Sequence, residues 1–370
     1  MALDIDIRFD PGVQPKPPQN GELERENLTF GRKFSPHMFL VRYAADQGWH
    51  DPVIEPYGPL MLEPSSLCLH YAQEVFEGMK AYARADGEIG LFRPRDNAHR
   101  FNISCRRVCI PEIDEALFVR AVETLVDLDR DWVPAIDGSA LYVRPAVIAT
   151  ERALGLRVSQ EYIFFVITGP VGPYFGSFQP IRICTMPEFT RAAPGGTGAA
   201  KTAGNYAAGL LPAREAAAAG YQQVLFLDAA EKRYLEELGG MNVFIREGDK
   251  ISTPALTDTI LAGITRDSLI TLARDHGYTV EERPIAIDEL LAGISSGRVE
   301  EVFACGTAAV TTPISVIGHG GKDYTVADGT AGEATKALFR ALTSIQYGRS
   351  EDPYGWAPVV RHSVPAGKES

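Results

Sequence analysis

The chain contains 370 residues, of which 45% are hydrophobic and 23% are charged, and its formal net charge is −12. These proportions are typical of a globular protein, and the length favours two domains over one. The negative charge argues against nucleic acid and against an anionic membrane surface as partners. Arginines and helix N-termini can still form a local pocket for a small anion.

The sequence carries no signal for export, membrane insertion or cross-linking. Its first residues lack the basic and apolar segments of a signal peptide, and no apolar run approaches the roughly 18 residues of a membrane span. The five cysteines are odd in number and scattered, which does not favour a disulfide framework. We therefore expect a cytoplasmic protein with no membrane partner.

The sequence divides into four regions in chain order. Residues 1–28 are polar and rich in proline, which predicts an N-terminal arm. Residues 29–172 predict a small α/β domain. Residues 173–180 end a stretch rich in glycine and proline that suits a linker. Residues 181–370 resume the mixture of strands and helices, so we expect a larger C-terminal domain and a mixed α/β (α+β) fold.

Hydrophobic periodicity and turn residues predict the individual elements. In the first domain we expect a hairpin turning at Asp86-Gly87, helices over 95–108 and 114–128, and strands over 140–150 and 161–171. In the second domain we expect strands over 181–186, 223–228 and 300–305, a strand context over 233–245, helices over 266–277, 287–294 and 334–348, and a hairpin over 314–326.

A single lysine, Lys201, stands among small residues in "GGTGAAKTAGNYAAG". A phosphate-cradling loop needs glycine directly before the lysine and a strand leading into the loop. Here Ala200 precedes the lysine and no apolar strand runs into Gly195, which disfavours a nucleotide-binding loop. A lysine that attacks an aldehyde remains open, as does the ordinary solvated loop lysine.

Pyridoxal phosphate chemistry needs further groups around such a lysine, and the sequence offers candidates. Tyr206 could reach the ring O3′. Either Glu236 or Glu237 could face the ring nitrogen, and in a strand one of them should point outward. Thr265 is a candidate N-cap at a helix start that could bind phosphate, and Gly306–Ala308 form a second turn of small residues.

Seven motifs in register carry a resemblance to a known family. They are "FEGMKAY", "LFRPRDNAHRF", "YVRPAVIATE", "GPVGPYF", "AAKTAGNYAAG", "EELGGMN" and "FACGTAAVTTP". Together they resemble the branched-chain amino acid aminotransferases of the long actinobacterial and animal-like type, over nearly the whole chain from Phe30. The resemblance implies the two-domain fold type IV architecture, shared with D-amino acid aminotransferase, with pyridoxal 5′-phosphate as cofactor.

The resemblance also implies cofactor-binding residues. Lys201 would hold the internal aldimine and then move the proton between Cα and C4′. Glu237 would pair with the ring nitrogen, and Tyr206 would donate to O3′. The phosphate would be bound by Arg100, by the backbone N–H groups of Ile264 and Thr265, and by Thr307. Gly240 stands where the animal enzymes have a threonine near the cofactor.

For the substrate, the resemblance implies an aromatic pocket formed by Phe30, Phe76, Tyr142 and Tyr174. Tyr71 would come from the partner subunit of a homodimer. Arg144 would accept the distal carboxylate of glutamate, and the backbone N–H groups of Thr307 and Ala308 would accept the α-carboxylate. The implied reaction is ping-pong transamination of leucine, isoleucine and valine with 2-oxoglutarate.

Some features depart from the family or leave alternatives open. Ala309 and Thr312 replace the redox cysteine pair of the animal enzymes, so we expect no thiol switch. Cys105 and Cys109 predict core packing, and no metal site is expected. A D-amino acid aminotransferase, an aminodeoxychorismate lyase, a nucleotide-binding protein with a phosphate loop, and a cofactor-free binding protein remain as alternatives.

Overall fold

The computed structural model describes residues 6–172 and 178–362. Contacts divide the chain into unit 1, residues 1–174 and 344–370, and unit 2, residues 175–343. Within the described ranges, no helix is long and apolar enough to cross a membrane. Most of the predicted linker, and Tyr174 with it, lies outside the described residues.

The described part of unit 1 contains an eight-stranded sheet with the order β1-β3-β2-β8-β7-β5-β6, in which β4 also pairs with β7. Its elements are β1 (Arg8–Phe9), η1 (Arg25–Asn27), β2 (His37–Ala44), β3 (Gly48–Pro56), α1 (Leu67–Tyr71), β4 (Glu74–Phe76), β5 (Met79–Ala83), β6 (Ile89–Leu91), α2 (Pro94–Arg107), α3 (Glu115–Leu128), η2 (Arg130–Trp132), β7 (Ala140–Ala149) and β8 (Glu161–Val171).

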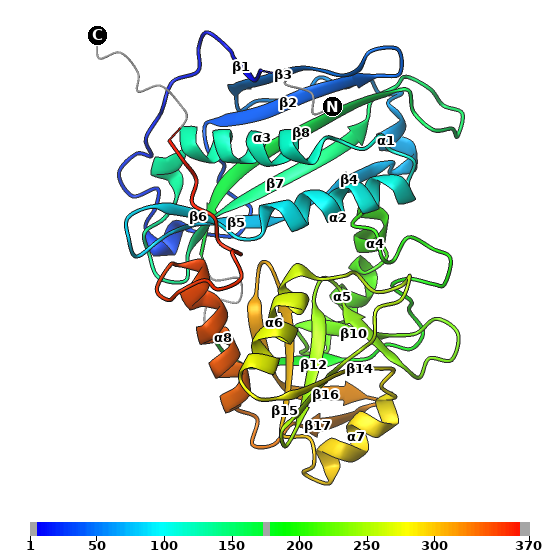
Figure 1. Ribbon diagram of the computed structural model, residues 1–370. Helices are drawn as coiled ribbons and strands as arrows, with labels where there is room; N and C mark the ends of the chain where they lie inside the picture. Colours follow the sequence, from blue (N-terminus) through cyan, green and yellow to red (C-terminus); the bar gives the residue numbers. More distant parts are fainter. Residues whose placement is uncertain (1–5, 173–177, 363–370) are drawn as a thin grey trace. The chain divides into compact units, whose positions relative to one another are not determined.

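Helices α2 and α3 lie side by side on one face of this sheet (Figure 1). The rings of Phe101 in α2, Phe118 in α3 and Phe164 in β8 meet with centroids 5.3–5.5 Å apart and are fully buried. Burial of each ring contributes about 2–3 kcal/mol. Asp114 caps α3 by accepting the backbone N–H groups of Ala116 and Leu117. Gly87 takes φ +85° in the β5–β6 hairpin, as the turn predicted.

The last described residues belong to unit 1, whereas the sequence placed them in the C-terminal domain. Backbone hydrogen bonds explain the difference, because they join this segment to the β5–β6 hairpin and the residues after it. The donor–acceptor pairs are Ala85 N to Tyr347 O (2.8 Å), Leu91 N to Pro358 O (3.0 Å), Arg93 N to Trp356 O (2.7 Å) and Val360 N to Ile89 O (2.8 Å). We call residues 347–360 the C-terminal strap.

The described part of unit 2 contains a nine-stranded sheet with the order β11-β10-β9-β16-β15-β12-β13-β14, and β17 pairs with β16. Its elements are β9 (Ile181–Cys184), α4 (Ala203–Ala207), α5 (Leu210–Ala218), β10 (Gln223–Leu227), β11 (Leu235–Leu238), β12 (Asn242–Glu247), β13 (Lys250–Thr253), α6 (Ile264–Asp275), β14 (Thr279–Glu282), α7 (Ile287–Ser295), β15 (Glu301–Gly306), β16 (Val310–His319), β17 (Lys322–Thr325) and α8 (Glu333–Gln346), whose last residues belong to unit 1.

Candidate active site

Lys201 and Tyr206 are in direct contact. Nζ of Lys201 donates to the Tyr206 hydroxyl at 2.7 Å and lies 5.1 Å from the centroid of its ring. Tyr206 belongs to the short helix α4, which begins two residues after Lys201, and this turn of helix brings the phenol next to the amine. Asn205 stabilises this arrangement, since its side-chain amide donates to the carbonyls of Thr197 and Ala200.

The small residues before Lys201 have a packing role. A Cβ atom on Gly198 would lie 2.6 Å from both Ala192 Cβ and Thr259 Cα, closer than atoms can approach. The loop that carries Lys201, residues 195–201, therefore packs directly against the segment around Thr259. We call residues 195–201 the lysine loop.

Both glutamates of β11 are buried, with 5% of Glu236 and 3% of Glu237 exposed. The expectation that one of them points outward is wrong, because β11 is covered on both faces. Glu237 accepts from the backbone N–H of Leu261 at 2.9 Å and from the side-chain amide of Asn242 at 3.2 Å. Burial raises the pKa of Glu237 to about 7, against the opposing effects of Arg191 and Lys201.

Arg191 forms a buried ion pair with Glu237. Sequence reasoning missed this residue because nothing in "PEFTRAAP" distinguishes it from a surface arginine. The pairing joins two residues that are 46 positions apart in the sequence, so it depends on tertiary packing.

The start of α6 lies next to Glu237. Leu261, whose N–H contacts Glu237, precedes Gly263, and Gly263 is the N-cap with φ −67° and ψ 127°. The prediction of Thr265 as N-cap is wrong, because the helix begins at Ile264. Ile264 and Thr265 instead occupy the first turn, where backbone N–H groups point toward the helix N-terminus and can bind an anion.

Gly240 and the turn at Gly306–Ala308 complete this group in unit 2. A Cβ atom on Gly240 would lie 3.7 Å from Cε1 of Tyr206, and one on Gly306 would lie 3.3 Å from the Gly240 carbonyl oxygen. Unit 2 thus brings together an amine, a phenol, a buried carboxylate and a helix start. This donor set fits pyridoxal phosphate. The predicted residues in it are Lys201, Tyr206, Glu237, Gly240, Ile264, Thr265, Thr307 and Ala308.

Within unit 1, four predicted substrate residues form a second group. The rings of Phe30 and Tyr142 meet edge to face with centroids 4.9 Å apart. The Arg144 guanidinium lies 4.8 Å from the centroid of the Phe76 ring, and its Nη2 donates to the Tyr142 hydroxyl at 3.2 Å. A Cβ atom on Gly78 would lie 2.0 Å from that hydroxyl, which explains the glycine of "FEGM".

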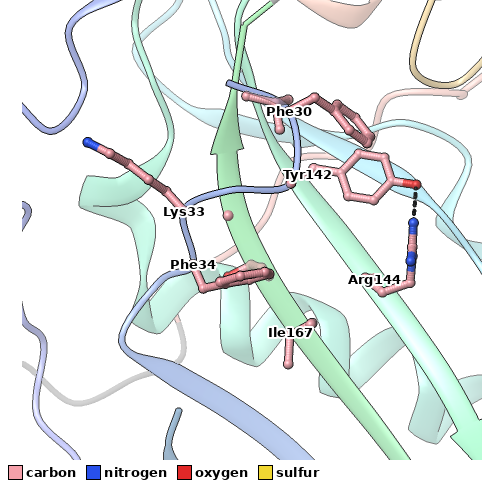
Figure 2. Close-up of a pocket in the computed structure, with 10 residues that line it drawn as sticks. Phe30, Lys33, Phe34, Tyr142, Arg144 and Ile167 are labelled. Carbon is pink, nitrogen blue, oxygen red and sulfur yellow. Dashed lines mark hydrogen bonds between the residues drawn. The ribbon is translucent and has the colours of Figure 1, made fainter. Parts of the chain in front are cut away.

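A pocket of about 280 Å³ opens beside this group (Figure 2). Phe30, Tyr142 and Arg144 line it, and a dashed line marks the hydrogen bond from Arg144 to Tyr142. Phe34 and Ile167 also line the pocket, and sequence reasoning missed both. Ile167 pairs directly with Arg144 across β7 and β8, so strand alternation is the signal that could have indicated it.

Arg100, the predicted phosphate ligand, is oriented by Glu77 in unit 1. Its Nε and Nη2 atoms donate to the two carboxylate oxygens of Glu77 at 2.7 and 2.8 Å, and Glu77 is fully buried. This bidentate pair restricts the orientation of the guanidinium.

Tyr71 is the last residue of helix α1. It is 39% exposed, and its hydroxyl donates to the Leu154 carbonyl. Tyr174 belongs to the part of the chain that is not described.

The prediction of core packing holds for Cys105, which is buried, and is wrong for Cys109, which is exposed at a residue with φ +56°. Among the described residues, no cluster of His, Cys, Asp and Glu could hold a metal ion.

Comparisons with known proteins agree with this geometry. The family described as "Amino-transferase class IV" matches residues 74–317. The chain is 49% identical to the branched-chain-amino-acid aminotransferase of Mycolicibacterium smegmatis, over 89% of this chain and 91% of that protein. It is 47% identical to the probable branched-chain-amino-acid aminotransferase of Streptomyces coelicolor, over 95% of this chain and 97% of that protein.

Solved structures of similar fold include an enzyme with bound cofactor. The Escherichia coli branched-chain amino acid aminotransferase superposes with a TM-score of 0.72 at 27% identity, covering 87% of this chain and 99% of that one. The Thermobaculum terrenum branched-chain amino acid aminotransferase in its PLP-form superposes with a TM-score of 0.75 at 25% identity, covering 89% of this chain and 100% of that one. These matches confirm the predicted fold class, and the chain belongs to the class IV aminotransferase family.

Proposed function

We propose that this protein catalyses the pyridoxal-phosphate-dependent transamination of L-leucine, L-isoleucine and L-valine with 2-oxoglutarate. The products are branched-chain 2-oxo acids and L-glutamate, formed by a ping-pong mechanism. The names of the similar proteins support the substrate class. The contact between Lys201 Nζ and the Tyr206 hydroxyl, in the same unit as buried Glu237, carries the proposal.

Each side chain in unit 2 has a role that its chemistry suits. When bound, pyridoxal phosphate supplies the electron sink that stabilises negative charge at the substrate Cα. Lys201 would hold the cofactor through Nζ and, once released from it, would take and return the Cα proton. Tyr206 would orient Nζ through its hydroxyl. Glu237 would hold a proton on the ring nitrogen.

Anionic parts of the ligands would be bound by backbone groups and by arginines. The first-turn N–H groups of Ile264 and Thr265, with Thr307 and Arg100, would bind the phosphate. The N–H groups of Thr307 and Ala308 would receive the α-carboxylate.

The aromatic group of unit 1 would bind the substrate side chain. Its rings suit an aliphatic side chain, while Arg144 offers a charge for the distal carboxylate of glutamate. One pocket can therefore accept both partners of the exchange.

We also propose a homodimer in which Tyr71 enters the partner's site. An exposed apolar surface supports it. This surface comprises Leu69 and Tyr71 of α1 with Leu154, Leu156 and Val158, and Leu156 is 80% exposed. Contacts between Tyr71 and Leu154 and between Ser66 and Arg152 join its two segments. Large exposed apolar patches mark interaction sites. We call these five residues the apolar patch.

A cytoplasmic location is part of the same proposal. All five cysteines are free thiols, as expected in a reducing compartment.

Absorbance of the purified protein in the near-ultraviolet and visible range tests this function. We expect a bound-cofactor band that changes on addition of L-leucine, and no such band in the Lys201→Ala variant. Glutamate formation from 2-oxoglutarate should require L-leucine, L-isoleucine or L-valine. Activity with D-alanine in place of these amino acids would favour a D-amino acid aminotransferase. A protein that never binds pyridoxal phosphate would rule out both.

A further inference from the structure

We propose that Arg191 is a positioning residue, which holds the Glu237 carboxylate and the lysine loop in the geometry in which both meet the cofactor. This inference rests on the proposed function, since it assigns Glu237 to the ring nitrogen. Arg191 itself would touch neither cofactor nor substrate.

One nitrogen of Arg191 joins three segments of unit 2. Nη2 contacts the Gly198 carbonyl in the lysine loop at 3.0 Å, the Thr259 carbonyl at 3.0 Å, and a carboxylate oxygen of Glu237 in β11. Gly198 lies three residues before Lys201. The nitrogen that holds the Glu237 carboxylate therefore also holds the backbone of the lysine loop. Gly198 also packs closely against Thr259, so the contact with Arg191 lies where the lysine loop meets its neighbouring segment.

The charges around Glu237 show why an arginine is needed there. Burial disfavours the ionised carboxylate, and Glu236, the next residue, adds a second acidic group. Arg191 is the foremost opposing influence, ahead of Lys201. The buried thiol of Cys305 is a further titratable group close enough for Glu237 to affect its pKa. The ionised carboxylate accepts a stronger, charge-assisted hydrogen bond from a protonated ring nitrogen than the neutral carboxyl group does.

The burial of the Arg191–Glu237 ion pair argues that the pair does more than stabilise the fold. The side chains of Arg191 and Glu237 are each only 4% exposed, and such burial offsets much of the attraction between the charges. In addition, Nε of Arg191 is buried without a hydrogen-bond partner among the described residues. The pair therefore stabilises the fold poorly while fixing two functional groups well.

A double-mutant cycle on cofactor binding tests the proposal. Apoprotein is titrated with pyridoxal phosphate, and affinity and the pH dependence of the bound-cofactor spectrum are measured for Arg191→Met, Glu237→Gln and the double variant. We expect Arg191→Met to weaken binding at least 10-fold and to shift the pH profile. In the Glu237→Gln background Arg191→Met should weaken binding by a smaller factor than in the wild type, because only its effect through the lysine loop remains. Arg191→Lys should restore part of the affinity.

Arg246→Met is the matched control. Arg246 also pairs with a buried glutamate of unit 2, Glu301, at 2.9 Å. It is four residues along β12 from Asn242, roughly 13 Å at the rise of a strand. Its loss should lower stability toward urea and leave the affinity and the pH profile unchanged.

Several outcomes would overturn the proposal. Arg191 would have a structural role only if the fold-losses of cofactor affinity in Arg191→Met and Glu237→Gln multiply in the double variant. The same conclusion would follow if Arg191→Met binds the cofactor as tightly as Arg246→Met does. If Arg191→Met does not fold, the same cycle with Arg191→Lys decides between these results. A wild-type protein that binds no pyridoxal phosphate would instead refute the proposed function.

Discussion

At the scale of residues, two buried glutamate–arginine pairs have opposite arrangements. In unit 1 the arginine, Arg100, is the expected ligand and Glu77 lies behind it. In unit 2 the glutamate, Glu237, is the expected ligand and Arg191 lies behind it. Each charge proposed to meet the cofactor is thus held by an opposite charge, which restricts its orientation before the cofactor arrives.

The pKa of Glu237 predicts how the stability of the apoprotein depends on pH. Its folded value of about 7 lies above the ordinary 4.5, so the folded chain holds the proton more tightly than the unfolded chain. The contribution of Glu237 to the free energy of unfolding is fully present below pH 4.5 and is lost as the pH rises through 7. The loss amounts to about 3 kcal/mol, at 1.36 kcal/mol for each pKa unit.

Urea unfolding of the apoprotein and of Glu237→Gln between pH 5 and 8 measures this effect. The free energy of unfolding of the wild type should fall relative to that of the variant as the pH rises. A difference that stays constant over this range would show that Glu237 does not titrate there.

The sequence identifies the residues proposed to contact the cofactor better than the residues that position them. Lys201 and Tyr206 are five residues apart in a recognisable motif, so their roles follow from the family resemblance. Whether Glu236 or Glu237 faces the ring is left open by alternation, and both prove buried. Arg191 could not be predicted, because its partner is 46 residues away and no local pattern links them. The roles of the site residues stay predictions until they are tested.

At the scale of elements, the predicted helices and strands are confirmed wherever periodicity is clear. The helices over 95–108 and 114–128 correspond to α2 and α3. Helices α1, α4 and α5 and strands β1, β2, β3, β4, β13 and β14 were not predicted. Strand β2, "HMFLVRYA", has five buried residues in succession and so shows no alternation. Strand β3 contains prolines, which weaken the strand signal.

Helix α8 depends on a carboxylate from another element. Glu301 in β15 accepts the backbone N–H groups of Ala334 and Thr335 at 3.0 and 2.8 Å, in the first turn of α8. A Cβ atom on Gly332 would lie 2.0 Å from Cδ of Glu301. We therefore expect Gly332→Ala to displace this cap and to lower the free energy of unfolding by about 1–3 kcal/mol.

Urea unfolding monitored by circular dichroism checks this expectation. Gly58→Ala is the control, since the nearest atom to a Cβ there is 3.8 Å away. Equal stabilities of the two variants would mean that Glu301 moves without loss and that α8 does not need this cap.

At the scale of the whole molecule, the apolar patch predicts the effect of a charge on assembly. Leu156→Glu places a carboxylate where the proposed dimer would bury it. We expect the dimer dissociation constant to rise at least about 100-fold, or about 2.7 kcal/mol, with loss of transaminase activity as Tyr71 leaves the partner's site.

Analytical ultracentrifugation over a range of protein concentrations measures this effect. Leu156→Met keeps the apolar surface and should remain dimeric. If Leu156→Glu is as dimeric and active as the wild type, the patch is not the interface.

The fold class and the family could be predicted because seven motifs occur in order along the chain, and the comparisons confirm both. The C-terminal strap could not, because residues 347–360 have neither helical nor strand periodicity. Their place depends on backbone hydrogen bonds to a hairpin more than 250 residues earlier.

The strap also has a consequence for the newly made chain. Strand β6 lies at the edge of its sheet, where the strap bonds to it, and the whole of unit 2 is translated between the two. More than 250 residues separate β6 from the strap, and at 5–20 residues per second ribosomes need roughly 13–50 s for that stretch. During this interval the edge of β6 lacks its final cover, and an open sheet edge can pair with another chain. The nascent protein should depend most on chaperones in those seconds, before its last residues emerge.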